Sequence, residues 1–287
     1  MGPFEPVPVQ VRLPADKFMF QKLRRNLERN IFGKDPHYHD PYEDPAEQFY
    51  ARIYLKYLFE KIDSEFRSRV KILDIGCHTG RLAIPLARAG HEVTAIDSSR
   101  FHIKRAEQHA QAEGVHCHFL RGDGFQKARE FPAGSFDIVL CTEVLYQRPD
   151  FRDRMRDLLQ AVRLGGLFAT SHRTRFFYLT RAVREQDSET ARKIISHKEG
   201  ELWGSYFNWQ TSGELKELYD QLGTDLLLVR PIGVFTGNGE EGMAKLCNLS
   251  EVSPAEREAL LDLESFDSDE FASIGRYLFA IGRKIKS

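Results

Sequence analysis

The sequence has no close pair of cysteines and no long apolar run. Its four cysteines, Cys77, Cys117, Cys141 and Cys247, form no C-x-x-C pair, which argues against a disulfide framework or a structural zinc site. No window approaches the roughly 18 apolar residues of a membrane-spanning helix. The first residues, MGPFEPVPVQV, lack the basic and apolar regions of a secretory signal. These absences predict a cytoplasmic protein with reduced thiols.

Neither sign of charge is in excess. The chain has 41 Lys and Arg against 42 Asp and Glu, so no overall positive field is available to hold a nucleic-acid backbone. Hydrophobic residues make up 41% and charged residues 29%, as in an ordinary globular protein. The length of 287 residues predicts one or two domains, at roughly 150 residues each.

Residues 1–67 are predicted to form an N-terminal arm and a helical cap. Residues 1–16 are rich in proline, which favours an extended arm. Residues 16–29 alternate apolar and basic side chains at helical spacing, and their basic face could contact phosphates. A loop, KDPHYHDPYEDP, then leads into the helical pattern QFYARIYLKYLFEKI.

Residues 68–287 alternate short apolar runs with amphipathic stretches, the pattern of βαβ units. The expected strands are VKILDIG, HEVTAID, HCHFLRGD, FDIVLCT, GLFATSH, DLLLVRPIGVF and RYLFAIGRK. This predicts an α/β fold with a doubly wound, mostly parallel, seven-stranded sheet. An acidic insertion at about 237–270 is a candidate lid or dimer contact, and Ser253 is expected to cap a short helix that starts at Pro254.

The segment VKILDIGCHTG, residues 70–80, is the sharpest functional signal. A buried strand ends in Asp74, turns through Gly76 and opens a helix after Gly80. Small residues there let backbone N–H groups approach a polar ligand at the carboxyl edge of the sheet. Because His78 and Arg81 stand where a dinucleotide fingerprint needs glycine, the pattern disfavours NAD.

Two further acidic residues follow the next two strands. Asp97 ends HEVTAID and could accept both hydroxyls of a ribose. In RGDGF, Asp123 could accept from an adenine amino group, and Phe125 could lie against the ring. Taken in order, the three strand ends predict a site for a nucleoside-like ligand.

From Val70 to Lys284 the sequence resembles the class I S-adenosylmethionine-dependent methyltransferases. The resemblance rests on LDIGCHTGR, AID, RGDGF, FDIVLCTEVLY with RPD, and LLQAVRLGGLFATSH. The nearest subtype includes quinone-biosynthesis and natural-product enzymes. The resemblance implies a Rossmann-like fold, S-adenosylmethionine as cofactor and S-adenosylhomocysteine as product.

The resemblance also implies roles for single residues. Asp74, Gly76, Cys77 and Gly80 are expected around the methionine part, Asp97 and Ser98 at the ribose, Asp123, Gly124 and Phe125 at the adenine, and Thr142 at the cofactor through its backbone. Two residues depart from the pattern. His78 replaces the middle glycine, and Pro85 lies inside the expected first helix, which should lose one hydrogen bond and bend.

Methyl transfer needs alignment and water exclusion more than an elaborate set of catalytic groups. A general base would lie at the ends of the fourth and fifth strands, where Glu143, Tyr146 and His172 are the candidates. Glu143 could instead anchor a loop. The groups HYHD and HCH lack the third and fourth ligands of a metal site, so no metal is expected.

The acceptor is predicted to be a small or medium-sized molecule. The chain has CTEVLY where amino-methylating relatives have N-P-P-Y or D-P-P-Y, which disfavours methylation of adenine or glutamine side chains. The methylated atom is predicted to be oxygen, with carbon and nitrogen left open. Aromatic residues cluster at 38–54 and 176–209; they either fill a helical cap or line an aromatic acceptor's site. Two alternatives stay open: an RNA methyltransferase that uses the basic helix, and a non-catalytic, cofactor-binding regulator.

Overall fold

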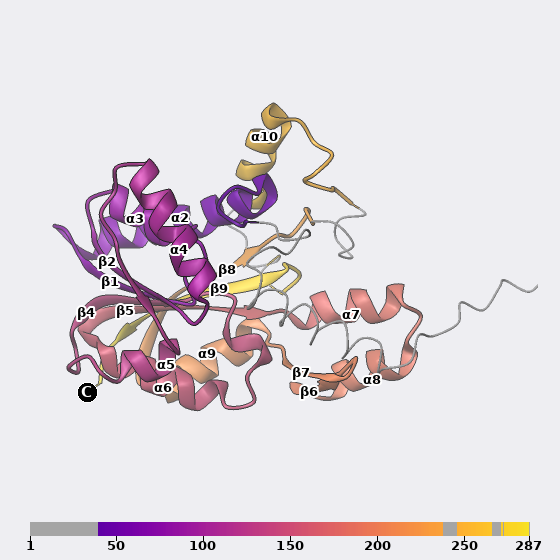
Figure 1. The fold of residues 1–287 in the computed structure, drawn as a ribbon. Helices are drawn as coiled ribbons and strands as arrows, with labels where there is room; N and C mark the ends of the chain where they lie inside the picture. Colours follow the sequence, from indigo (N-terminus) through magenta and orange to yellow (C-terminus); the bar gives the residue numbers. More distant parts are fainter. Residues whose placement is uncertain (1–39, 238–245, 266–270, 272, 287) are drawn as a thin grey trace, which may run out of the picture. The chain divides into compact units, whose positions relative to one another are not determined.

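The computed structural model describes residues 40–237, 246–265, 271 and 273–286. The predicted arm and the basic helix at 16–29, with His37 and His39 of HYHD, lie outside the described residues. Labels follow Figure 1. The strands are β1 Lys71–Ile75, β2 Glu92–Asp97, β3 His118–Arg121, β4 Phe136–Cys141, β5 Val162–Arg173, β6 Glu199–Leu202, β7 Ser205–Asn208, β8 Thr224–Ile232 and β9 Tyr277–Lys284.

The helices alternate with these strands along most of the chain. They are α2 Pro45–Glu65, α3 Ala83–Arg88, α4 Arg100–Ala112, α5 Gly124–Ala128, α6 Phe151–Ala161, α7 Arg175–Arg184, α8 Ser188–Ser196, α9 Ser212–Gln221 and α10 Pro254–Glu264, with a 3₁₀ turn, η1, at Leu145–Gln147. No helix of the described residues is long and apolar enough to cross a membrane.

The predicted seven-stranded, mostly parallel sheet is confirmed. Its strand order is β3-β2-β1-β4-β5-β9-β8, and only β9 runs antiparallel to its neighbours. The order reverses beside β1, so the carboxyl ends of β1 and β4 form the switch point where such sheets bind ligands. The inner strands are apolar almost throughout, as strands covered on both faces must be.

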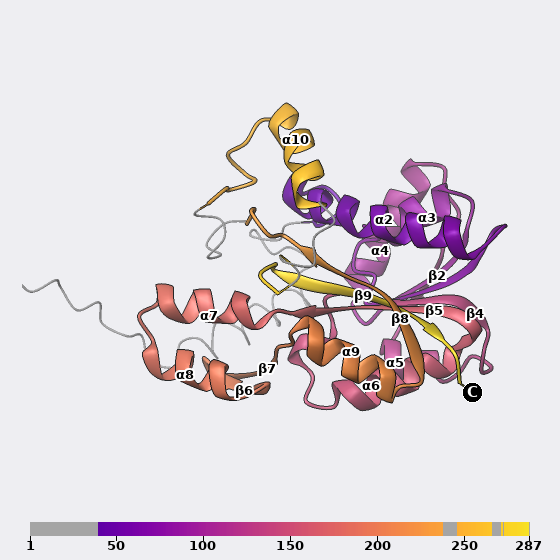
Figure 2. The same ribbon diagram turned by 180° about the vertical axis from the view of Figure 1, so that it is seen from behind.

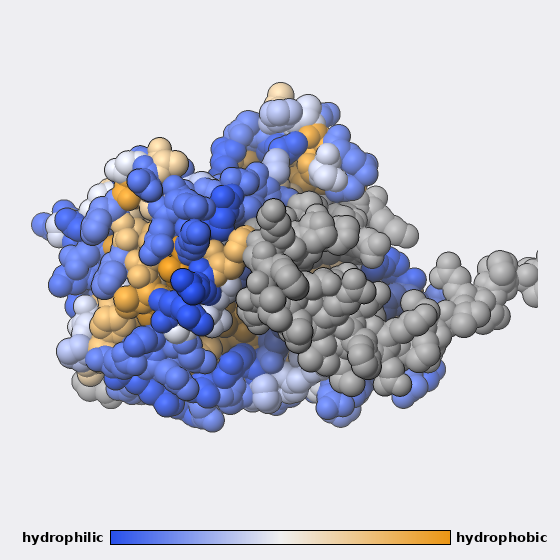
Figure 3. Space-filling view, in the orientation of Figure 1, coloured by the Kyte–Doolittle hydropathy of each residue, from blue (hydrophilic) through white to orange (hydrophobic). Residues whose placement is uncertain are grey.

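Helices cover both faces of this sheet (Figures 1 and 2). Side chains of α2, α3 and α4 pack into one core with one face of the strands, and side chains of α5, α6 and α9 pack into a second core with the other face. Figure 3 shows hydrophobic residues reaching the surface in a band between the two helical layers, while the outer helix faces are hydrophilic.

The helix α2 belongs to the same compact unit as the sheet. Asp44 caps it, Pro45 occupies its first turn, and ten of its residues are buried. The insertion helix α10 packs on α2 through the ion pair Arg52–Glu258 and a 2.8 Å hydrogen bond from Lys56 to Ser265. The division into a cap at 1–67 and a cofactor domain at 68–287, with a lid at 237–270, remains a prediction.

Three local expectations can be compared with the structure. Ser253 does cap α10, in a capping box with Glu256. The predicted bend at Pro85 was wrong, because α3 begins at Ala83 and places the proline in the first turn, where its missing N–H breaks no helical bond. The strand expected to include His116 begins only at His118.

Residues 174–211, after β5, form a small subdomain that the sequence patterns did not resolve into elements. It contains α7, α8 and the β6–β7 hairpin around its own core of Tyr178, Ala182, Ile194, Leu202 and Trp209. The indole Nε1 of Trp209 donates to the carbonyl oxygens of Ile194 and His197, at 3.1 and 2.7 Å. This core accounts for several of the aromatic residues at 176–209.

Candidate functional site

The turn after β1 takes a backbone conformation that glycine favours. Gly76, His78 and Gly80 all have positive φ, of 76°, 50° and 93°. A Cβ on Gly76 would collide with Cγ2 of Val144, and one on Gly80 would lie 2.7 Å from Cδ1 of Ile84. His78 adopts the left-handed conformation of the glycine that the motif has at this position. The turn therefore keeps its shape despite the histidine.

A cavity of about 210 Å³ lies beside this turn. Its lining joins the turn to the start of α2 and to the loop after β4, and consists of Pro41, Glu47, Asp74, Gly76, Cys77, His78, Arg81, Leu82, Thr142 and Glu143. Five predicted site residues meet here: Asp74, Gly76, Cys77, Thr142 and Glu143. The other eight do not line the cavity: Gly80, Asp97, Ser98, Asp123, Gly124, Phe125, Tyr146 and His172.

Asp74 presents a buried carboxylate to the cavity. It is 2% exposed, and no hydrogen bond to its side chain occurs within the described part of the chain. Burial raises the pKa of Asp74 to about 7, and Asp97 adds to this while Arg81 opposes it. A carboxylate in such a place needs a cationic or hydrogen-bonding ligand to hold its charge.

Asp97 stands at the end of β2 with most of its acceptor positions used. Its Oδ1 accepts from the Ser99 amide at 2.8 Å and lies 3.1 Å from Nδ1 of His102, and its Oδ2 accepts from the His78 amide at 3.0 Å. The rings of His78 and His102 stack with centroids 3.5 Å apart. Oδ2 keeps one position for a further donor such as a ribose hydroxyl. The neighbouring Ser98 is exposed.

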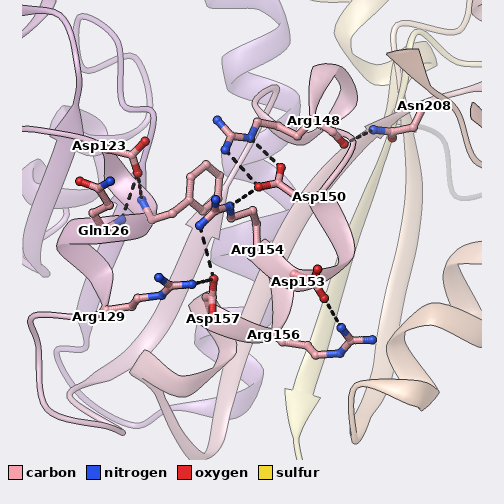
Figure 4. A network of polar contacts seen from close by, with 11 residues as sticks. Asp123, Gln126, Arg129, Arg148, Asp150, Asp153, Arg154, Arg156, Asp157 and Asn208 are labelled. Carbon is pink, nitrogen blue, oxygen red and sulfur yellow. Dashed lines mark hydrogen bonds and ion pairs between the residues drawn. The ribbon is translucent and has the colours of Figure 1, made fainter. Parts of the chain in front are cut away.

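The predicted adenine-side residues have clear structural roles (Figure 4). Asp123 caps α5, and its Oδ1 accepts from the amides of Phe125 and Gln126 at 3.0 Å. A Cβ on Gly124 would come within 2.7 Å of Ile75. The ring of Phe125 is buried, with the guanidinium groups of Arg148 and Arg154 at 5.0 and 5.5 Å. A purine could reach Phe125 only if these arginines moved.

Arg81 ties α2 to the loop after β4. Its guanidinium pairs with Glu143 at 2.6 Å and with Glu47 at 2.5 Å. Burial alone would raise the pKa of Glu143, but Arg81, helped by Arg276 and Arg173, lowers it to about 2. Glu143 also has a φ of 59°, and its amide donates to Ser171. This geometry matches the loop-anchoring alternative for Glu143 better than a general base.

The two other candidate bases lie away from the cavity. His172 is fully buried on the far face of the sheet, where its Nε2 lies 2.7 Å from Oγ1 of Thr170, and burial lowers its pKa to about 3. This burial disfavours a catalytic role. Tyr146 is half-buried. Its ring centroid lies 6.0 Å from the ring centroid of Tyr277 and 5.1 Å from Cζ of Arg173.

Asp40, the described member of the HYHD group, closes one side of the site. Its carboxylate accepts from Thr79 of the glycine turn at 2.5 Å and from Arg105 of α4 at 3.1 Å, and lies 2.9 Å from Nε2 of His109. With Glu43 it forms an acidic group of metal-like spacing, but Arg105 pairs with both carboxylates. We interpret it as an ion-pair cluster that fixes residues 40–44 against the turn.

Sequence reasoning missed four residues that the structure brings to the site: Arg81, Glu47, His102 and Arg173. The sequence could have pointed to Arg81, because this residue directly follows the glycine motif. Glu47 and His102 had none, since each lies on a helix whose face is set only by tertiary packing. Arg173 ends a strand that was expected to end at residue 172.

Comparison with known proteins indicates which kind of nucleoside-like ligand this site is suited to bind. Residues 72–166, which run from β1 into β5, match a family described as a methyltransferase domain. This stretch of the chain is therefore similar to a methyltransferase domain. This methyltransferase domain contains the glycine turn, Asp97, Asp123 and the loop after β4, and the cofactor of its class is S-adenosylmethionine.

Curated relatives of the methyltransferase domain are similar over part of the chain. A ubiquinone biosynthesis O-methyltransferase from Rickettsia prowazekii is 31% identical over 131 residues, 44% of this chain and 51% of that protein. One from Caulobacter vibrioides is 39% identical over 105 residues, 36% of this chain and 41% of that protein. The chain thus spans about half the length of the curated relatives it matches.

Solved structures confirm the fold of the methyltransferase domain. A SAM-dependent methyltransferase from Methanosarcina mazei has a TM-score of 0.54 at 18% identity, over 79% of this chain and 97% of that one. A 1,6-didemethyltoxoflavin-N1-methyltransferase from Burkholderia thailandensis, with bound S-adenosylhomocysteine, has a TM-score of 0.52 at 16% identity, over 98% and 94%. At these identities the likeness shows the fold alone.

Proposed function

We propose that this protein transfers the methyl group of S-adenosylmethionine to a hydroxyl of a small or medium-sized aromatic acceptor. The observation that carries the proposal is the buried carboxylate of Asp74, which faces a cavity beneath the left-handed glycine turn of a methyltransferase domain. A buried acid with no partner among the described residues fits the ammonium group at the amino-acid end of the cofactor.

The other predicted site residues are proposed to contact the rest of the cofactor in the order that the sequence implied. Gly76 and Gly80 let backbone N–H groups of the turn approach the amino-acid end, where Cys77 and Thr142 also line the cavity. Asp97 has a carboxylate position left for a ribose hydroxyl. Asp123, Gly124 and Phe125 lie after β3, on the adenine side, and Phe125 needs its covering arginines to move aside.

When bound, the sulfonium of the cofactor supplies an electrophilic methyl group. The protein's part is to hold the acceptor oxygen in line with the sulfur and methyl carbon, and to exclude water. The buried pairs of Arg81 with Glu47 and Glu143 fix α2 and the loop after β4 against the cavity. This arrangement supplies rigidity at the place where the acceptor must enter.

A hydroxyl acceptor is supported by two features. The curated relatives carry the name O-methyltransferase. In addition, Glu143, the one predicted base among the described residues that lines the cavity, has a pKa lowered to about 2, and His172 is buried elsewhere. The site therefore favours an acidic hydroxyl, such as that of a phenol or catechol, which needs little help to lose its proton.

The predicted location and the two alternative functions rest on the sequence alone. A cytoplasmic location is proposed from the cysteine usage alone. The RNA methyltransferase alternative depends on residues 16–29, which lie outside the described residues. The regulator alternative predicts cofactor binding without turnover.

A turnover assay distinguishes these functions. The full chain is incubated with S-adenosylmethionine labelled at the methyl group and with catechol, a simple phenol, a primary aromatic amine or bulk tRNA. We expect label in the catechol or phenol and release of S-adenosylhomocysteine. Label only in tRNA would establish the RNA alternative, and tight S-adenosylhomocysteine binding with no labelled product would establish the regulator.

A further inference from the structure

Arg173 is a buried cation that has no carboxylate partner among the residues that the structure describes. It is the last residue of β5 and is 8% exposed. Its Nε and Nη1 have no hydrogen-bond acceptor within the residues that the structure describes. A buried donor left unpaired destabilises the fold, and more strongly when it carries a charge. Such a group is expected to serve a purpose that offsets this cost.

Three aromatic rings surround this guanidinium. Its Cζ lies 3.9 Å from the ring centroid of Tyr277, 4.0 Å from that of Phe177 and 5.1 Å from that of Tyr146. At these distances the cation lies over the π-faces of the three rings, which attract its charge but accept few of its N–H hydrogen bonds. The rings thus surround the charged group, while its Nε and Nη1 still lack an acceptor among the described residues.

The nearby carboxylates are used elsewhere. Glu47 and Glu143 both pair with Arg81, and Glu47 also lies 3.7 Å from Nη1 of Arg276. The charge of Arg173 helps to lower the pKa of Glu143, but the two side chains form no ion pair. Within the described ranges, no carboxylate lies within ion-pair distance of Arg173.

Arg173 does not line the cavity, but it lies close enough to Glu143 of the lining for its charge to lower the pKa of that residue. Along β5, His172 faces the core of α5, α6 and α9, so the adjacent Arg173 faces the other side of the sheet. Tyr277 and Tyr146, which contact Arg173, pack with the core that includes Cys77 and Leu82 of the cavity lining. The side chain therefore lies at the carboxyl edge of β5, beside the loop that carries Glu143.

We propose that Arg173 binds a carboxylate group of the acceptor. The guanidinium supplies in-plane donors, and the surrounding rings of Tyr146, Phe177 and Tyr277 supply an apolar wall for an aromatic or planar body. This rests on the function proposed above, because it takes the mouth of the cavity as the acceptor site. It narrows the acceptor class to aromatic carboxylic acids that carry a hydroxyl.

The cofactor also carries a carboxylate, in its amino-acid part, and that group could bind Arg173 instead of the acceptor. The test therefore adds the two ligands in separate steps. The first step saturates the protein with S-adenosylhomocysteine, and the second adds benzoate or its neutral analogue benzamide. The readout is the ¹H–¹⁵N resonance of the Arg173 Nε–H, identified as the signal lost in Arg173→Lys. We expect benzoate to shift this signal in the second step and benzamide to leave it unchanged.

Calorimetry supplies the matching affinities. We expect the saturated wild type to bind benzoate at least tenfold more tightly than benzamide, and Arg173→Met to bind both equally. Arg163→Met is the matched control and keeps the preference, because Arg163 lies at the other end of β5, pairs with Asp137 at 2.6 Å and stacks on Phe66.

Three results would overturn the proposal: a shift of the signal with S-adenosylhomocysteine but none with benzoate, equal or absent binding of the two probes by the saturated wild type, or a preference that survives Arg173→Met. Each of these leaves S-adenosylhomocysteine binding intact. A failure of the proposed function would instead show as no S-adenosylhomocysteine binding in the first step.

Discussion

Asp74 decides much of the chemistry of the site at the scale of single residues. The sequence showed an acid at the end of a buried strand, and the structure shows it 2% exposed and facing the cavity. Its raised pKa, about 7, could not be predicted from the sequence, because it depends on how completely tertiary packing removes water from the carboxylate. The protonation of this residue is expected to control cofactor binding.

Cofactor binding should therefore depend on pH through Asp74. The ammonium of S-adenosylhomocysteine requires the ionised carboxylate, so the affinity should rise about tenfold between pH 6 and pH 8. Asp74→Asn should bind weakly at both values. Calorimetric titration at the two pH values measures this, with Asp153→Asn, a surface substitution, as the control. The same tenfold rise in Asp74→Asn would contradict the assignment.

The raised pKa of Asp74 also has a consequence for stability. An acid whose pKa is higher in the folded protein than in the unfolded chain destabilises the fold as pH rises from about 4 to about 7. Asp74→Asn should therefore raise the Tm of the free protein at pH 8. A lower Tm at that pH would show that the carboxylate is stabilised by contacts other than those described.

Glu143 should stabilise the fold as a partner of Arg81. Its pKa of about 2 lies below the usual value near 4.5, a shift that corresponds to about 3 kcal/mol, present above pH 4.5 and lost as pH falls towards 2. Glu143→Gln should cost about that much in urea unfolding at pH 7 and much less at pH 3. Glu185→Gln, at a surface pair, should cost little at either pH. An equal loss for Glu143→Gln at both pH values would argue against the ion pair.

At the scale of elements, the strands were more predictable than their surroundings. Apolar runs such as those of β1 and β4 are recognisable because both faces of an inner strand are buried. The start of α3 was placed too early, and with it the effect of Pro85, because helix ends depend on caps and packing rather than on periodicity. The β6–β7 hairpin was missed because it is short and packs in a separate small core.

The hairpin has a role in holding the loop after β4. Nδ2 of Asn208, at the end of β7, donates to the carbonyl oxygen of Leu145 at 2.8 Å. It also donates to the carbonyl oxygen of Arg148 at 3.3 Å (Figure 4). Asn208→Ala should cost about 1–2 kcal/mol and raise the KM for the acceptor, with little change in S-adenosylhomocysteine affinity. Asn248→Ala, at an exposed turn, is the control. An unchanged KM in Asn208→Ala would show that the hairpin does not position this loop.

At the scale of the whole molecule, the order of motifs along the chain predicted the sheet and the place of the site. Three acids after three successive strands meet at one edge only if the strands are parallel neighbours, and β1, β2 and β3 are. The contribution of α2 could not be predicted, because Glu47 reaches Arg81 across 34 residues of sequence. Of the predicted site residues, five line the cavity and the others lie around it. The sequence could not predict which residues line the cavity, because this depends on tertiary packing.

The most direct test of the account is the binding of S-adenosylhomocysteine to the full chain, measured by calorimetry for the wild type, Asp97→Asn and the surface control Asp153→Asn. We expect micromolar binding by the wild type and the control, and a loss of about tenfold or more in Asp97→Asn, because the ribose loses its charged acceptor. Thermal unfolding of each variant confirms that it is folded. No binding by the wild type, or equal binding by Asp97→Asn, would contradict the proposed cofactor site.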